Sequence, residues 1–385
     1  MRTMGNGVGR YLFIVSSSYG HLFPAIRLAH VLQSHGGDVL FVAARENQFL
    51  LESQGLKCVC FTGQPHPFLS TYNWYESYTG QQQYQLIRAV ADAYRPDTIV
   101  GTPLALPAFI LSELCSTPLI VIGYCEYLFP GVGDAGSAKQ WRIESITRHY
   151  NELRQRLGLP AISADPADSP LIGDIHLIRS VPQFTARDGM PPCVKYVGAL
   201  LWEPAYVNHD LDRFVAARPN RESPIFYVQI GRLFEEPHRW ERLVRLLGDA
   251  PARFIVDLGR SDYLSDHAEF PDNFYLHPFI PMGHVKDEIS GVICSGQTTS
   301  VLSALFHGKP MLGIPNSGDG AEVTRRIVDH GVGTGIFDPA GLEEAVLSKF
   351  IHSATQGCFQ TKLMLQQSSF QAHDDDARLF AEVSS

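Results

Sequence analysis

The sequence has few cysteines, and those it has are scattered. Seven occur among 385 residues, and only Cys58 and Cys60 lie close together. The absence of paired C-x-x-C spacings argues against a zinc site. The pattern is typical of reduced thiols, so we expect a cytoplasmic protein.

Long apolar runs and an excess of positive charge are also missing. No segment approaches the length of a transmembrane helix, and the first ten residues lack the apolar stretch of a signal peptide. A formal net charge of −9 disfavours nucleic acid or an anionic membrane as the main partner. An apolar fraction of 45% in a chain of this length is enough for two domains with their own cores.

What the sequence does contain is an alternation of strand-like and helix-like stretches that occurs twice. It begins with the apolar run Tyr11–Val15 and starts again at Ile225–Ile230. This rhythm predicts an α/β protein with two doubly wound domains. We expect domains at residues 1–205 and 223–372, a polar linker at 206–222, and a C-terminal helix at 373–385 that returns to the first domain.

A histidine occupies the predicted junction between the first strand and the first helix. Ser16–Ser18 and Gly20 predict a loop, and Pro24 is typical of the first turn of a helix over about Ala25–Gln33. His21 is therefore expected at the carboxyl end of a strand, where open α/β sheets bind ligands. A capping or packing role is the alternative.

The segment Phe68–Gly80 is rich in aromatic residues and has no clear helix or strand period. It contains Tyr72, Trp74, Tyr75 and Tyr78. Such a cluster favours a wall for an apolar or aromatic ligand over a plain surface loop. The alternative is a loop folded onto the core.

A second small polar loop precedes a predicted helix in the second half. Gly296, Thr298 and Thr299 lead from a buried strand into a helix that begins at Ser300. Free N–H groups, the helix dipole and nearby hydroxyls make such a helix start an anion site. Asp319 follows the next predicted strand, so we expect a ligand with phosphate at one end and hydroxyls at the other.

These motifs resemble the GT-B nucleotide-sugar-dependent glycosyltransferases, the group that includes plant and antibiotic-tailoring enzymes. The resemblance covers nearly the whole chain and rests on GHLFP at 20–24, PDTIV at 96–100, FIPMGHV at 279–285 and residues 292–336. It implies two Rossmann-like domains facing a central cleft. It also implies metal-independent, inverting sugar transfer from a UDP- or dTDP-linked donor to a hydroxyl of a small, aromatic or polycyclic natural product. We expect no further cofactor and leave a homodimer open.

The resemblance assigns roles to residues at matching positions. His21 corresponds to the base that deprotonates the acceptor, and Tyr72, Trp74, Tyr75 and Tyr78 are expected to line the acceptor site. Phe279 lies at the position that stacks on the nucleobase, followed by Ile280. The remaining donor-binding candidates are Arg232, Ser295, Gly296, Gln297, Thr298, Thr299, Ser300, Asp319 and Gly320.

Several polar identities depart from the family pattern. Ser295 replaces a histidine that contacts the donor phosphate, Ser303 a glutamate, and Gly320 a glutamine. Arg232 could neutralise the diphosphate in place of that histidine. The aspartate that orients the base in many relatives is absent after the PDTIV strand, and Glu126 is the candidate substitute.

These departures leave two other functions open. The chain could be a catalytically impaired relative that acts as a binding or auxiliary protein, or a nucleotide-sugar epimerase. Transfer is favoured because His21 and the aromatic segment both imply an acceptor.

Overall fold

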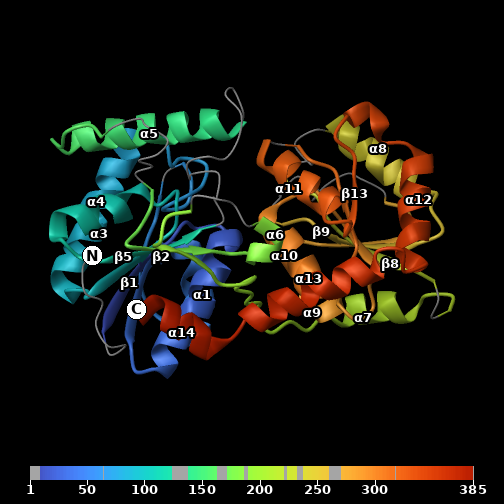
Figure 1. Cartoon of the computed structure of the whole chain (residues 1–385), viewed down its shortest axis with the longest axis horizontal. Coiled ribbons are helices and arrows are strands. Elements are labelled where there is room, and N and C mark those ends of the chain that lie inside the picture. The colour runs from blue at the N-terminus through green and yellow to red at the C-terminus, as the bar shows by residue number, and fades with distance from the viewer. Residues whose placement is uncertain are drawn as a thin grey trace. The chain divides into compact units, whose positions relative to one another are not determined.

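The computed structural model describes residues 9–63, 65–123, 138–162, 171–185, 190–220, 223–231, 237–259, 270–316 and 318–384. The chain forms two compact units. The first comprises Met1–Trp202 with Ala372–Ser385, and the second comprises Glu203–Gln371. Figure 1 shows helices packed around a sheet in each unit. Within the described ranges, each helix is too short or too polar to cross a membrane.

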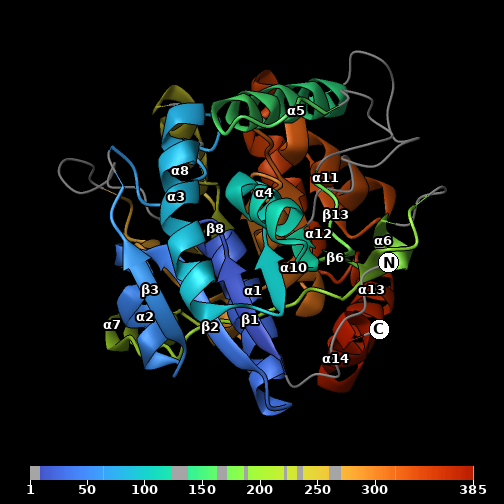
Figure 2. The same ribbon diagram turned by 90° about the vertical axis from the view of Figure 1, so that its left-hand side faces the viewer.

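The described part of the first unit contains a seven-stranded parallel sheet in the order β3-β2-β1-β4-β5-β6-β7. The order reverses at β1, which pairs with β2 on one side and β4 on the other; Figure 2 shows β1, β2 and β3 side by side. The strands are β1 Arg10–Ile14, β2 Asp38–Ala44, β3 Lys57–Phe61, β4 Thr98–Gly101, β5 Leu119–Gly123, β6 Ile175–Ile178 and β7 Val194–Tyr196. The carboxyl ends of β1 and β4 therefore flank the position where open sheets bind ligands.

Helices cover the first sheet because its strands are apolar along their length. In β1 every residue after Arg10 is buried, as parallel strands covered on both faces require. The helices are α1 Tyr19–Ser34, α2 Gln48–Ser53, α3 Ser77–Tyr94, α4 Leu106–Cys115, α5 Ala138–Arg156, α6 Pro182–Thr185 and α14 Asp376–Ser384.

The C-terminal helix α14 packs on α1. Arg27 of α1 forms an ion pair with Asp376 at 2.5 Å. The His35 ring stacks on Phe380 with ring centroids 3.8 Å apart. The end of the chain thus contributes to the first unit.

The second unit has the same design with a six-stranded parallel sheet among its described residues, in the order β10-β9-β8-β11-β12-β13. Here the order reverses between β8 and β11. The strands are β8 Ile225–Gln229, β9 Arg253–Asp257, β10 Phe274–His277, β11 Gly291–Cys294, β12 Met311–Gly313 and β13 Gly333–Gly335. The helices are α7 His209–Ala216, α8 Pro237–Gly248, α9 Met282–Val285, α10 Thr298–Phe306, α11 Gly318–Asp329, α12 Glu344–Thr355 and α13 Gln360–His373.

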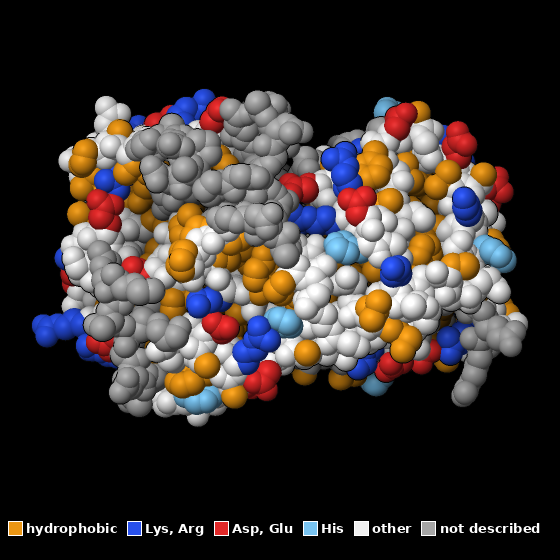
Figure 3. Space-filling view, viewed as in Figure 1, with side chains coloured by type: hydrophobic (Ala, Val, Ile, Leu, Met, Phe, Trp, Pro, Cys, Tyr) orange, Lys and Arg blue, Asp and Glu red, His pale blue; other side chains and the backbone are white. Residues whose placement is uncertain are grey.

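The predicted fold class, two doubly wound α/β domains, is confirmed by these two sheets. On the face drawn in Figure 3, cationic and anionic side chains are interspersed among hydrophobic and neutral ones.

Two local expectations were wrong. α1 begins at Tyr19, so His21 lies in the first helical turn and Pro24 lies inside the helix. α3 begins at Ser77, so Tyr78 is helical and is not part of an irregular loop.

Candidate functional site

His21 is held in the first turn of α1, directly after the loop that follows β1. The backbone N–H groups of His21 and Leu22 both donate to the carbonyl of Ser18, at 3.0 and 2.9 Å. The imidazole is buried, with 6% of its surface exposed. The residue therefore lies at the carboxyl end of β1, as predicted.

A buried arginine, Arg179, supplies a hydrogen-bond donor that the first turn of α1 lacks. Pro24 lacks the N–H that would donate to the carbonyl of Gly20 four residues earlier. That carbonyl instead accepts a hydrogen bond from Nη1 of Arg179 at 3.0 Å. Nε of Arg179 donates to the carbonyl of Ala199 at 3.2 Å. The first turn of α1 is thereby tied to the residue that follows β6.

The surroundings of His21 keep it neutral. Burial, and secondly the positive charge of Arg179, lower its pKa from 6.5 to about 4. The ordinary pKa of a histidine side chain, 6.5, therefore does not apply at this site. A neutral imidazole has one ring nitrogen that can accept a proton, and here it stays in that state throughout the neutral pH range.

Thr102 is the residue after β4, in the stretch Gly101–Pro103 where the resemblance led us to look for an aspartate. Its Oγ1 lies 3.1 Å from the backbone nitrogen of Ser16 and 3.2 Å from its Oγ. Thr102 thus fixes the loop that leads to His21, but it carries no charge. Glu126, the predicted substitute, lies outside the described residues.

The aromatic segment begins next to the same loop. Ser17 donates its backbone N–H to the carbonyl of Leu69 at 3.0 Å. Trp74 packs against the core and meets the ring of His149 edge-on, with centroids 5.3 Å apart. Three tyrosines stay exposed at 46–59%, namely Tyr72, Tyr75 and Tyr78. The structure separates the four predicted acceptor residues into one that packs on the core and three on the surface.

In the second unit, the loop before α10 brings two backbone segments close together. Gly296 has φ +72°, and an added Cβ would lie 2.3 Å from the carbonyl oxygen of Gly320. Only glycine fits this close approach of two backbones. Gln297 is the N-cap residue, and its side chain makes no capping hydrogen bond to α10.

Hydroxyl groups surround this helix start. Ser295 is 1% exposed, and its Oγ has no hydrogen-bond partner among the described residues. The buried Oγ of Ser303 on α10 is likewise unpartnered there. Ser300 is different, because its Oγ donates to Oε1 of Gln229. Buried hydroxyls without partners are costly, so Ser295 and Ser303 are candidates for contact with a ligand.

The segment after β10 is the predicted nucleobase segment, and the structure places it in the second unit with the α10 loop. Phe279 is half-buried, and its carbonyl contacts Nδ1 of His277 at 2.8 Å. Ile280 is fully buried, and its carbonyl accepts a hydrogen bond from Oη of Tyr227 at 2.8 Å. The carbonyls of Phe279 and Ile280 are thus each contacted by a side chain of the sheet, His277 of β10 and Tyr227 of β8.

Two predicted donor residues cannot be placed by their side chains. Arg232 lies outside the described residues, and Asp319 is described only as backbone in α11. Sequence reasoning also missed functional neighbours. Arg179 follows a short strand that was not predicted, whereas Asp257 had a visible signal, an acidic residue directly after the apolar run Phe254–Val256.

The comparisons with known proteins point to one class. No family model matches the chain. A match to demethyllactenocin mycarosyltransferase of Streptomyces fradiae is 26% identical and covers 30% of this chain but only 25% of that protein. The elloramycin glycosyltransferase ElmGT of Streptomyces olivaceus is 26% identical over 370 residues, covering 88% of this chain and 86% of the relative.

A similar architecture occurs in the spinosyn rhamnosyltransferase SpnG, solved both with thymidine diphosphate and with spinosyn aglycone. The structure with thymidine diphosphate has a TM-score of 0.71 at 18% identity and covers 98% of this chain and 100% of that one. The predicted resemblance to GT-B natural-product glycosyltransferases is confirmed in sequence by the relatives and in fold by this structure.

Proposed function

We propose that this chain transfers a sugar from a nucleoside diphosphate sugar to a hydroxyl of a small molecule. Its fold and its sequence are both similar to those of natural-product glycosyltransferases. The observation that carries the proposal is the buried, neutral His21 at the carboxyl end of β1. The acceptor side of the reaction rests on the first unit and the donor side on the second.

His21 would act as the general base. The acceptor oxygen attacks the anomeric carbon, and the bond from that carbon to the diphosphate oxygen breaks on the opposite face. The electron pair leaves with the diphosphate, and the acceptor proton moves to the imidazole. Each sugar is thus transferred with inversion, and positioned proton transfer of this kind contributes about 10²–10⁴ in rate.

The lowered pKa of His21 favours an acceptor with an acidic hydroxyl. An imidazole whose pKa is about 4 is a weak base. It removes a proton more readily from a phenol, whose pKa is about 10, than from an aliphatic alcohol. We therefore propose a phenolic or similarly acidic hydroxyl on an aromatic or polycyclic acceptor. The exposed rings of Tyr72, Tyr75 and Tyr78 would contact it, with Trp74 supporting them from the core side.

The donor would be a UDP- or dTDP-sugar held by the second unit. The N-terminus of α10, which follows the Gly296 turn, and the buried hydroxyl of Ser295 would donate hydrogen bonds to a diphosphate. Phe279 would stack on the base. Arg232, Gln297 and Asp319 remain proposed contacts to the diphosphate and the sugar. The thymidine diphosphate bound by the spinosyn enzyme supports this choice of ligand.

We also propose a cytoplasmic enzyme, because the cysteines within the described residues are free thiols. A homodimer is a further proposal that size-exclusion chromatography with light scattering would test. The proposed transfer needs no additional cofactor.

The test is His21→Ala beside a matched variant, His30→Ala, on the same helix. We expect His21→Ala to lower turnover by about 10²–10⁴ while nucleoside diphosphate affinity is unchanged. His30→Ala should retain normal turnover. Single-turnover rates and melting temperatures on the same preparations separate lost catalysis from lost folding. A well-folded His21→Ala protein with normal single-turnover chemistry would contradict the proposal.

A further inference from the structure

A buried carboxylate in the second unit contacts residues from several elements around the donor-side segments. Asp257 ends β9 and is 1% exposed. Its Oδ2 accepts hydrogen bonds from Oη of Tyr227 at 2.7 Å and Nε2 of Gln229 at 2.8 Å. Its Oδ1 accepts the backbone N–H of Gly259 at 2.7 Å. A carboxylate buried this deeply is tolerated only because these donors satisfy it.

Two of these partners, Tyr227 and Gln229, also form hydrogen bonds with residues at different ends of the proposed donor site. Oη of Tyr227 also lies 2.8 Å from the carbonyl oxygen of Ile280, in the nucleobase segment. Oε1 of Gln229 accepts the hydroxyl of Ser300, in the first turn of α10. A continuous chain of hydrogen bonds therefore runs from Ile280 through Asp257 to the helix start that would bind the diphosphate.

This hydrogen-bond network has fewer donor protons than acceptors at Tyr227. Tyr227 has one hydroxyl proton, yet Asp257 and Ile280 both offer it an acceptor. When Asp257 is protonated it can donate to Tyr227, which leaves the tyrosine proton for Ile280. When Asp257 is ionised, it draws that proton away from the Ile280 carbonyl. Burial raises the pKa of Asp257 to about 6, so both forms are accessible near neutrality.

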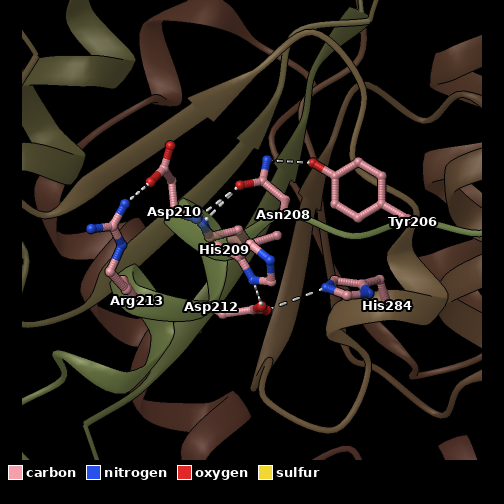
Figure 4. A network of polar contacts seen from close by, with 8 residues as sticks. Tyr206, Asn208, His209, Asp210, Asp212, Arg213 and His284 are labelled. Atoms are coloured by element: carbon pink, nitrogen blue, oxygen red, sulfur yellow. Dashed lines mark hydrogen bonds and ion pairs between the residues drawn. The ribbon is translucent and has the colours of Figure 1, made fainter.

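The far end of the nucleobase segment is anchored separately. The carboxylate of Glu203 accepts the first two backbone N–H groups of α9, at 3.1 and 2.9 Å. Figure 4 shows Tyr206 beside His284 of α9, with ring centroids 5.0 Å apart, and Asn208 donating to Tyr206 at 2.9 Å. This end is held without Asp257, so the influence of Asp257 falls on Ile280 and its neighbour Phe279.

We propose that Asp257 is a positioning residue that makes the nucleobase segment and the start of α10 adopt their binding geometry together. Occupation of one segment by the nucleoside then favours binding of diphosphate at the other. This inference rests on the proposed function, since it assumes that the two segments bind the two ends of one donor.

The experiment measures that coupling directly. Inorganic diphosphate is titrated calorimetrically with and without saturating thymidine, and in parallel with uridine. The proteins are the wild type, Asp257→Asn, Tyr227→Phe and, as a control, Asp249→Asn at the exposed position directly after α8. We expect the matching nucleoside to strengthen diphosphate binding at least about fivefold in the wild type and the control. In Asp257→Asn the factor should fall close to one.

Tyr227→Phe removes a single oxygen, so it tests the same chain even if Asp257→Asn does not fold. It should also abolish the coupling, and combining it with Ser300→Ala should give less than the sum of the two single losses in dTDP affinity. Equal coupling in folded Asp257→Asn and wild type would overturn the inference alone. A wild type that binds neither dTDP nor UDP would overturn the proposed function, and the inference with it.

Discussion

Replacing Arg179 tests how the environment of His21 sets its chemistry. Arg179→Met removes the positive charge beside the imidazole but keeps a long apolar side chain. Arg179→Lys keeps the charge but loses the two-armed contact to the carbonyls of Gly20 and Ala199. The two variants therefore separate the electrostatic role of the guanidinium from its structural role.

The magnitude follows from the causes of the lowered pKa. The pKa of His21 falls from 6.5 to about 4, and burial is a larger cause than the charge of Arg179. The charge thus accounts for less than half of the fall. We expect the pKa of His21 to be higher in Arg179→Met than in the wild type, by no more than about one pKa unit or roughly 1.4 kcal/mol, and to be unchanged in Arg179→Lys. Both variants should lose stability, about 1–3 kcal/mol, because a buried carbonyl loses its donor.

Two assays report this pKa. The first is the acid limb of the pH profile of kcat/KM, which should lie near 4 in the wild type. The second is NMR titration of the histidine ring proton whose signal is missing from His21→Ala, which needs no substrate. Because folding lowers this pKa, the wild type should also lose stability as pH falls from about 6.5 to about 4. An acid limb near 6.5 in the wild type, or no change in Arg179→Met, would refute the reasoning.

Three further outcomes are expected in the second unit. Because folding raises the pKa of Asp257 from 3.8 to about 6, its stabilising contribution is present below about pH 4 and is lost as pH rises through 6. Wild type should therefore lose roughly 3 kcal/mol relative to Asp257→Asn between those limits in urea unfolding, and parallel pH curves would contradict this. Gly296→Ala should cost at least about 1–2 kcal/mol in thermal unfolding, because a Cβ would lie 2.3 Å from the Gly320 carbonyl; an unchanged melting temperature would show that the loop can relax. Ser295→Ala should leave the ligand-free protein as stable as the wild type but weaken dTDP or UDP binding several-fold, and unchanged binding would remove Ser295 from the site.

The fold could be predicted from sequence because several of its strands contain continuous apolar runs. Runs such as Tyr11–Val15 and Ile225–Ile230 are typical of parallel strands covered on both faces, and Tyr11–Val15 located the strand that precedes His21. The strands β6 and β7 have only four and three residues, too short for any period to show.

The environment of the site could not be predicted, because it depends on contacts between distant residues. Pro24 indicated a helix start, yet the helix begins earlier because Arg179, 159 residues away from Gly20, supplies the donor that proline lacks. The same arginine moves the pKa of His21, and no local pattern contains that information. Asp257 shows the same limit, since its charge was visible but its link to Ile280 and Ser300 was not.

The central claim, acceptor-dependent sugar transfer with His21 as base, is tested most directly by one reaction series. The purified protein is incubated with a panel of UDP- and dTDP-sugars, with and without phenolic polycyclic acceptors. Nucleoside diphosphate release and product mass are followed together. We predict release that requires an acceptor, a product heavier by one sugar residue, and loss of both in His21→Ala. Conversion of the donor sugar without an acceptor, or acceptor-dependent release that persists in His21→Ala, would contradict the claim.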